Sequence, residues 1–172
     1  MPRFGSTIAA LILGMLVFHA YGENLTYAFQ LDDLDGVVTN AWLRLDSFGE
    51  IFWSQPLRAL PNYTLALNYR LGELDPTGYH LFNNFVHFAA GLAVFFFVYQ
   101  LATALSTTAA EADYRPFYIG FVAAALFVSH PIQTQAVTYI IQRQASMAAL
   151  FYILSLASDL FLVFGSLCLR RV

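Results

Sequence analysis

Four apolar stretches separated by polar segments dominate the pattern of this chain. A helix needs roughly 20 mostly apolar residues to cross a bilayer, and the stretches near residues 5–22, 79–104, 116–130 and 145–169 meet or approach that length. They predict an all-α polytopic membrane helix bundle with about four transmembrane helices. A long amphipathic outer segment, residues 23–78, separates the first two, and residues 131–144 form a shorter outer connection. We expect one membrane domain over residues 1–172.

Three prolines support these boundaries. Pro76, Pro116 and Pro131 follow Asp, Arg and His respectively, and each opens an apolar run. Proline is tolerated in the first turn of a helix, where its missing N–H would be unpaired in any case. Each proline is therefore a helix start signal.

Composition excludes several other classes of protein. Only 11% of the residues are charged and 59% are hydrophobic, whereas a soluble domain has roughly 25% charged residues. The single cysteine excludes an internal disulfide framework and a cysteine-rich zinc site. A net charge of −3 provides no basic field for nucleic acid. We therefore expect a lipid bilayer, and no nucleic acid, as a partner.

The arginines that flank the apolar stretches indicate orientation. Cytoplasmic loops are enriched in basic residues, which predicts cytoplasmic termini and places residues 23–78 and 131–144 on the outer face. The alternative for the first stretch is a cleaved signal peptide, since Ala20 and Gly22 have the spacing of a cleavage site. The arginines that set the orientation are Arg3, Arg115, Arg170 and Arg171.

An acidic cluster follows closely on the first apolar stretch. Asp32, Asp33 and Asp35 occupy three of four consecutive positions. Adjacent like charges destabilise each other's ionised form, and a general base must accept a proton near the working pH, so a general base is one interpretation of the cluster. The alternative is a solvated loop, or an N-cap for a helix over residues 37–45.

The outer segment also offers a cation among aromatic residues. Tyr and Trp favour the membrane interface, so we expect this segment to lie along the bilayer surface. Arg58 could bind a phosphate through paired donors, or pair with a carboxylate. Asn24 and Asn62 each begin a short glycosylation sequon.

Polar residues also mark the second apolar stretch and the outer connection. His80, Asn83 and His87 share one helical face, but two histidines seven positions apart make a poor metal pair without further ligands, so we expect no metal. After Pro131 we expect one helix on which Thr134, Thr138 and Gln142 form a polar stripe. That stripe would face protein or a wet cavity, or be the wet side of an interfacial helix.

Several of these motifs occur in the same order in one family. The chain resembles the N-terminal membrane part of the tetratricopeptide-repeat-linked O-mannosyltransferase-like proteins, members of the GT-C glycosyltransferase superfamily. The resemblance extends from about residue 25 to residue 155. It rests on Leu31–Asp33, Pro56–Leu60, Ala66–Tyr69, Leu74–Asn83, His87, Ser129–Ile140, Gln142 and Arg143.

The resemblance implies sugar transfer at the outer membrane face, from a polyprenyl- or dolichyl-phosphate-linked donor to a protein hydroxyl. In GT-C enzymes an acidic residue of the first outer loop is the catalytic base, which by position is Asp33 or Asp32 here. No cofactor is expected. From position and chemistry we add candidates for binding the donor phosphate: Arg58, His130, Gln142 and Arg143.

The chain also departs from the family pattern. Relatives continue through more spans, whereas this chain ends after its fourth apolar stretch and differs from them beyond Ser158. We expect either a truncated enzyme that works within a larger assembly or a noncatalytic accessory subunit, in both cases beside another membrane chain. A small transporter, suggested by Asp159, His80 and His87, is disfavoured because the first three stretches are almost purely apolar at their centres. The expected location is the bacterial inner membrane, or alternatively the endoplasmic reticulum.

Overall fold

The computed structural model describes residues 3–45, 47–106 and 114–169, and within these residues every regular element is helical. Arg170 and Arg171, two of the four arginines that predict the orientation, lie outside the described residues. The elements in chain order are α1 (Arg3–Tyr21), η1 (Gly22–Thr26), η2 (Leu34–Val38), η3 (Ala41–Arg44), α2 (Phe48–Ser54), η4 (Pro56–Arg58), α3 (Ala59–Gly72), α4 (Pro76–Leu105), α5 (Arg115–Ser129), η5 (Pro131–Gln133), α6 (Thr134–Thr138) and α7 (Arg143–Leu169).

Among the described residues, three segments are long and apolar enough to cross a membrane, namely Gly5–Thr26, Pro76–Leu105 and Arg143–Val163. A fourth candidate is the pair Arg115–Ser129 and Pro131–Thr138, which meets the same criterion together but is bent by 50°. The predicted fold class, an all-α polytopic helix bundle, is confirmed. The chain is an integral membrane protein.

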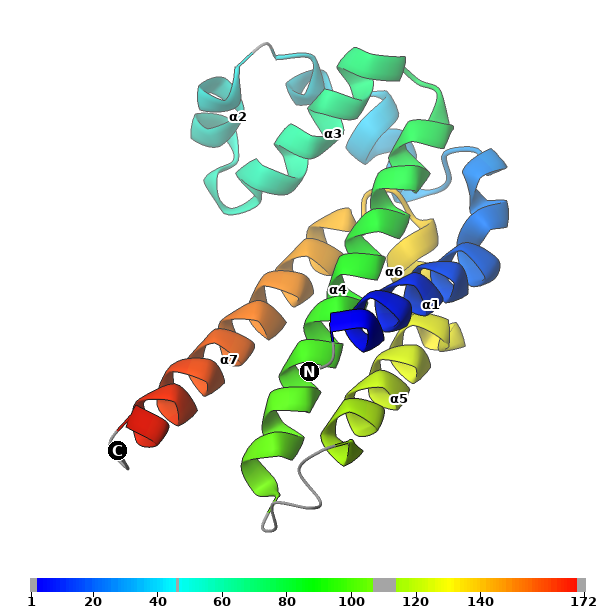
Figure 1. Ribbon diagram of the computed structural model, residues 1–172. Helices are drawn as coiled ribbons and strands as arrows, with labels where there is room; N and C mark the ends of the chain where they lie inside the picture. Colours follow the sequence, from blue (N-terminus) through cyan, green and yellow to red (C-terminus); the bar gives the residue numbers. More distant parts are fainter. Residues whose placement is uncertain (1–2, 46, 107–113, 170–172) are drawn as a thin grey trace.

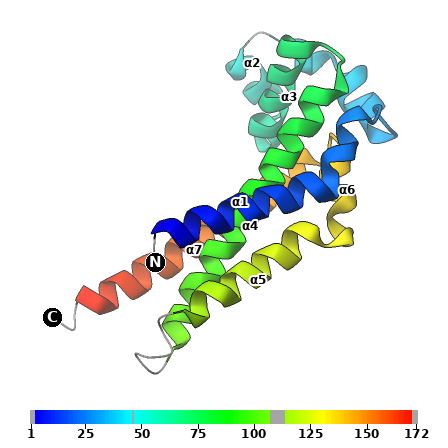
Figure 2. The ribbon, with the colours of Figure 1, turned by 45° about the vertical axis from the view of Figure 1, so that its right-hand side comes forward.

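The long helix α4 is the centre of this bundle (Figure 1). It packs against α1 and α5 on one side and against α7 on the other. The turned view shows α2 and α3, with the short helices η2, η3 and η4, gathered beyond one end of the bundle (Figure 2). We call residues 27–75 the cap.

Two hydrophobic cores hold these parts together. The membrane core joins α1, α4, α5 and α6 and contains Leu13, Val17, Tyr21, Phe95, Ala124, Val128 and Val137. The second core joins the cap to the start of α4 and to the α6–α7 connection. It contains Val37, Leu43, Ile51, Leu65, Ala66, Tyr79 and Ile140.

Side chains cap the starts of α2 and α4. Ser47 and Glu50 form a capping box at the start of α2. Asp75 caps α4 by accepting a hydrogen bond from the Thr77 backbone N–H at 3.0 Å. This hydrogen bond favours the ionised carboxylate and lowers the pKa of Asp75.

The outer connection is not the single helix that the polar stripe predicts. Helix α6 ends at Thr138 and the chain turns before α7 begins at Arg143. The side-chain amide of Asn83 lies 3.2 Å from Val137 O, 3.1 Å from Tyr139 O and 3.4 Å from Ile140 O. Tyr139 O and Ile140 O also accept from the Gln142 and Arg143 backbone N–H groups, each at 3.2 Å. These carbonyls are thus satisfied in a turn, without a continuous α-helix. The predicted stripe is therefore wrong, and Gln142 lies beyond the end of the helix.

Candidate functional site

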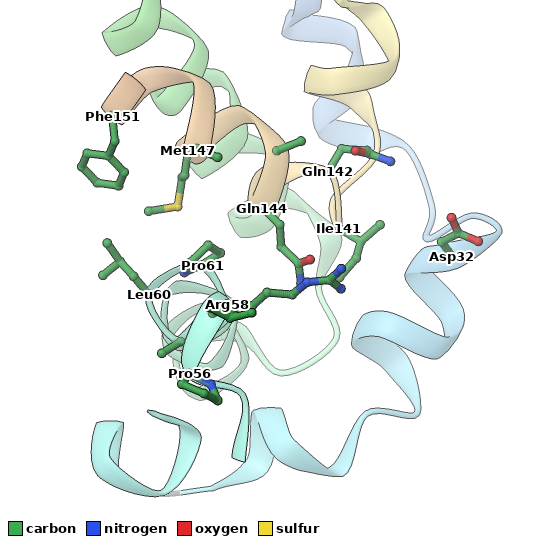
Figure 3. A pocket seen from close by; sticks show the side chains of 14 residues that line it. Asp32, Pro56, Arg58, Leu60, Pro61, Ile141, Gln142, Gln144, Met147 and Phe151 are labelled. Atoms are coloured by element: carbon green, nitrogen blue, oxygen red, sulfur yellow. The ribbon is translucent and has the colours of Figure 1, made fainter. Parts of the chain in front are cut away.

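A cavity of about 800 Å³ lies between the cap and the N-terminal turns of α7 (Figure 3). Three separate parts of the chain bring predicted site residues to its wall: Asp32 from the loop after α1, Arg58 from η4, and Gln142 from the α6–α7 connection. Apolar side chains complete the wall, and they include Leu57, Leu60, Met147 and Phe151. The cavity thus has both polar and apolar lining.

A tight turn leads into the two neighbouring aspartates. Leu31 adopts φ 46°, a left-handed conformation that is uncommon for a residue with a side chain. The Asp33 N–H donates to Gln30 O at 2.9 Å, and the Gln30 N–H donates to Asp33 Oδ2 at 3.3 Å. As a result Asp32 is exposed at the cavity, while Asp33 is 2% exposed and faces the protein.

Asp33 ties the loop after α1 to the α6–α7 connection. Its Oδ1 accepts a hydrogen bond from the Ile141 N–H at 2.8 Å. Gly36 allows this approach, because a Cβ at that position would lie 2.7 Å from Ile141 Cδ1. Both carboxylate oxygens of Asp33 are therefore engaged with backbone N–H groups.

Arg58 is the cation of the cavity. Figure 3 shows its side chain extending from η4 toward Ile141 and Gln144, with Asp32 beyond them. Its side chain is exposed, and within the described part of the chain it has no hydrogen-bond or ion-pair partner. A guanidinium in this state can offer paired donors to a phosphate.

Arg143 has a different environment from Arg58, since it is fully buried and does not line the cavity. Its Nε donates to Asn83 Oδ1 at 2.7 Å, and its Nη2 donates to Tyr79 O at 2.9 Å. Its Nη1 donates to Asn68 Oδ1 at 2.6 Å and to Thr64 Oγ1 at 3.2 Å. The guanidinium thus joins α3, α4 and α7, and we assign it a structural role.

Of the two remaining predicted phosphate-binding residues, one lines the cavity and the other does not. Gln142 is half-buried and lines the cavity. His130 is exposed and lies outside the cavity wall, where its Nδ1 accepts a hydrogen bond from the Ile132 N–H at 3.1 Å. The structure therefore brings Asp32, Arg58 and Gln142 together, and does not bring His130 or Arg143 to the same wall.

A chain of amides that the sequence analysis did not single out supports the cavity. Gln144 Nε2 donates to Asn62 Oδ1 at 2.9 Å, and Asn62 Nδ2 donates to Gln55 Oε1 at 2.7 Å. This chain connects α7 to α3 and to the residue before η4, the segment that carries Arg58. The sequence around each amide does not show which distant amide it will pair with, so these hydrogen bonds could not be predicted from the sequence.

The two sequon asparagines are both structural. Asn62 is 2% exposed, and Asn24 is 3% exposed and exchanges amide hydrogen bonds with Asn84 at 3.0 and 3.1 Å. A glycan on either residue is incompatible with this packing.

The two histidines of α4 bind backbone carbonyls. His80 Nε2 lies 3.0 Å from Tyr27 O, and His87 Nε2 lies 3.1 Å from Val128 O. Within the residues that the structure describes, no three His, Cys, Asp or Glu side chains are grouped so that they could hold a metal ion.

Comparison with known proteins gives one consistent result. The chain is 32% identical over 163 residues to protein O-mannosyl-transferase TMTC2 of Mus musculus, which covers 87% of this chain. It is 32% identical over 162 residues, 84% of the chain, to Tmtc2 of Drosophila melanogaster, and 30% identical over 160 residues, 85% of the chain, to protein O-mannosyl-transferase F38B6.6 of Caenorhabditis elegans. No family model and no solved structure matches the chain.

These relatives are much longer proteins. The aligned region is 18% of the mouse protein, 16% of the fly protein and 22% of the nematode protein. Each alignment covers most of this chain, including the motifs on which the family resemblance rests. The chain is therefore homologous to one part of these longer protein O-mannosyl-transferases, which agrees with the O-mannosyltransferase-like family that its sequence resembles.

Proposed function

We propose that this chain takes part in sugar transfer from a polyprenyl- or dolichyl-phosphate-linked donor to a protein hydroxyl, with the cavity between the cap and α7 as the donor site. The observation that carries the proposal is the lining of the cavity. The cavity is lined by the Arg58 guanidinium, which has no polar partner among the described residues, by the exposed carboxylate of Asp32, and by apolar side chains of α7. A lipid-linked sugar phosphate has the same division between an anionic headgroup and an apolar chain.

In the proposed reaction Asp32 is the general base. Its carboxylate accepts the proton of the acceptor hydroxyl as that oxygen forms a bond to the anomeric carbon of the sugar. The bond from that carbon to the phosphate oxygen breaks, and the lipid phosphate leaves with the electron pair. Arg58 stabilises the charge on the leaving phosphate, and Gln142 is a neutral donor to it. Asp33 positions the loop that carries Asp32.

The test uses membranes that contain the chain together with whatever membrane proteins accompany it. Transfer of labelled mannose from a polyprenyl phosphate to a Ser/Thr peptide is measured for Asp32→Asn, Arg58→Gln and the control Asp35→Asn. Asp32→Asn is expected to lower the rate by about 10²–10⁴-fold, the usual contribution of a general base. Arg58→Gln is expected to raise the donor KM by roughly tenfold or more, as the loss of a charged hydrogen bond implies.

Asp35 belongs to the same acidic cluster but does not line the cavity, so Asp35→Asn should leave the rate unchanged. If Asp33→Asn abolishes transfer while Asp32→Asn does not, the assignment of the base to Asp32 is wrong. If the wild-type chain and its companions neither bind the donor nor transfer sugar, the chain is an accessory membrane subunit.

The proposed reaction implies an orientation and a partner. Residues 23–78 would lie outside the cytoplasm and both termini inside it, in the bacterial inner membrane or, alternatively, the endoplasmic reticulum. We also propose that another membrane chain completes the site. Single cysteines placed at exposed Thr39, in the cap, and Tyr114, between α4 and α5, test the orientation in a chain whose Cys168 is replaced by serine. A membrane-impermeant maleimide should label only the first in sealed cells or vesicles.

A further inference from the structure

One edge of the cap carries large apolar side chains that the chain itself leaves uncovered. Trp53, at the end of α2, is 83% exposed, and Leu57, in η4, is 99% exposed. Leu60, in the first turn of α3, is 44% exposed. We call these three residues the cap edge. No acidic residue occurs from Ile51 to Tyr69, and the only charge there is Arg58.

The residues that line the cavity show which turns of the spanning helix α7 lie beside the cap edge. Leu57 and Leu60 line the same cavity as Ala148 and Phe151. Figure 3 shows Leu60 facing the turn of α7 that carries Met147, with Phe151 one turn further along. Phe151 is about 12 Å along the axis from the start of α7, at 1.5 Å per residue. The cap edge thus lies beside helical turns that belong to a candidate membrane span.

The surface of α7 at that level is itself apolar and uncovered. Phe151 is 48% exposed and Tyr152 67% exposed, as expected for side chains that contact lipid. The cap edge is therefore continuous with a lipid-facing surface. Trp is also enriched at the boundary between headgroups and acyl chains, where its ring is buried and its N–H stays hydrated.

We propose that the cap edge inserts into the outer leaflet of the bilayer, with Trp53 and Leu57 among the acyl chains and Arg58 reaching up to the lipid phosphates. Long basic side chains near an interface take this position readily. The cavity then opens sideways into the leaflet, between η4 and α7, as well as toward water. This inference depends on the membrane-spanning nature of the chain and not on its catalytic activity.

The chain's two tryptophans allow a direct test. Trp42→Phe leaves Trp53 as the only tryptophan, and Trp53→Phe leaves Trp42, which is 48% exposed in η3 and serves as the control. Each variant is reconstituted in phosphatidylcholine vesicles whose acyl chains carry bromine, and separately in plain vesicles with iodide in the water. We expect bromolipid to remove most of the Trp53 emission and iodide to have little effect on it. Trp42 should be the better quenched of the two by iodide.

A second pair of variants separates insertion from misfolding. Leu57→Asp changes a side chain with almost no contacts, so the fold should persist while bromolipid quenching of Trp53 falls. Leu71→Asp is the matched control, since Leu71 is 87% exposed at the opposite end of α3 and should not alter Trp53 quenching. Strong iodide quenching of Trp53 without bromolipid quenching would overturn the proposal. Protection from both quenchers would overturn it too, because protein rather than lipid would then cover the edge.

Discussion

The replacement of Arg143 by methionine tests the structural role of this residue most directly. Arg143 makes four hydrogen bonds within the bundle, with lengths from 2.6 to 3.2 Å, and its guanidinium stacks over the Phe82 ring at 4.4 Å from the centroid. Methionine fills a similar volume with an unbranched apolar chain but offers no donor. The substitution therefore removes the hydrogen bonds while leaving little empty space.

The expected loss of stability depends on the hydrogen bonds that are removed and on the buried acceptors that remain without a donor. Each hydrogen bond from a charged donor contributes about 1.5–3 kcal/mol, but the dehydration of the guanidinium opposes much of that sum. Asn83 Oδ1 is left buried without its donor, which costs about 1–3 kcal/mol. We expect a net loss of about 1–3 kcal/mol in the free energy of unfolding, the cost of leaving a buried neutral acceptor without its donor.

The assay is reversible unfolding in mixed micelles of a mild detergent and sodium dodecyl sulfate, followed by tryptophan fluorescence. Arg58→Met is the matched control, because Arg58 is an exposed arginine without a polar partner in the described residues, and its loss should change stability by no more than about 0.5 kcal/mol. Equal stabilities of the two variants would refute the structural role of Arg143. It would then be free for the phosphate-binding role predicted from the sequence.

Two further substitutions test the packing of the bundle. Gly120→Ala would place a Cβ 2.9 Å from the backbone oxygen of Phe95, which cannot move aside, so we expect a loss of about 1–3 kcal/mol in the same unfolding assay. Gly14→Ala, whose Cβ meets only an ordinary contact at 3.6 Å, is its control, and equal effects would contradict the packing argument. Asn84→Leu leaves the Asn24 amide without its partner in a buried site, so a loss of about 1–3 kcal/mol is expected. An unchanged midpoint for Asn84→Leu would show that water satisfies Asn24.

The order of elements could be predicted because its signals are local. Apolar runs of spanning length predicted the membrane bundle, and Pro76, Pro116 and Pro131 each lie at the N1 or N2 position of a helix. These signals depend on the few residues around each boundary. They are insensitive to what the helix later packs against.

The sequence predicted that the acidic cluster and Arg58 lie outside the spanning helices, and it indicated the family. It could not tell Asp32 from Asp33, or Arg58 from Arg143, because residues of the same type have the same chemistry in a sequence. In the folded structure the members of each pair differ in burial, because of contacts between distant residues: the Ile141 N–H donates to Asp33 from 108 positions away, and Asn83 accepts from Arg143 across 60 positions. A polar group that meets such a partner becomes structural, and one that meets none remains free to bind a ligand. That outcome depends on how the whole chain packs, so only the folded structure could provide it.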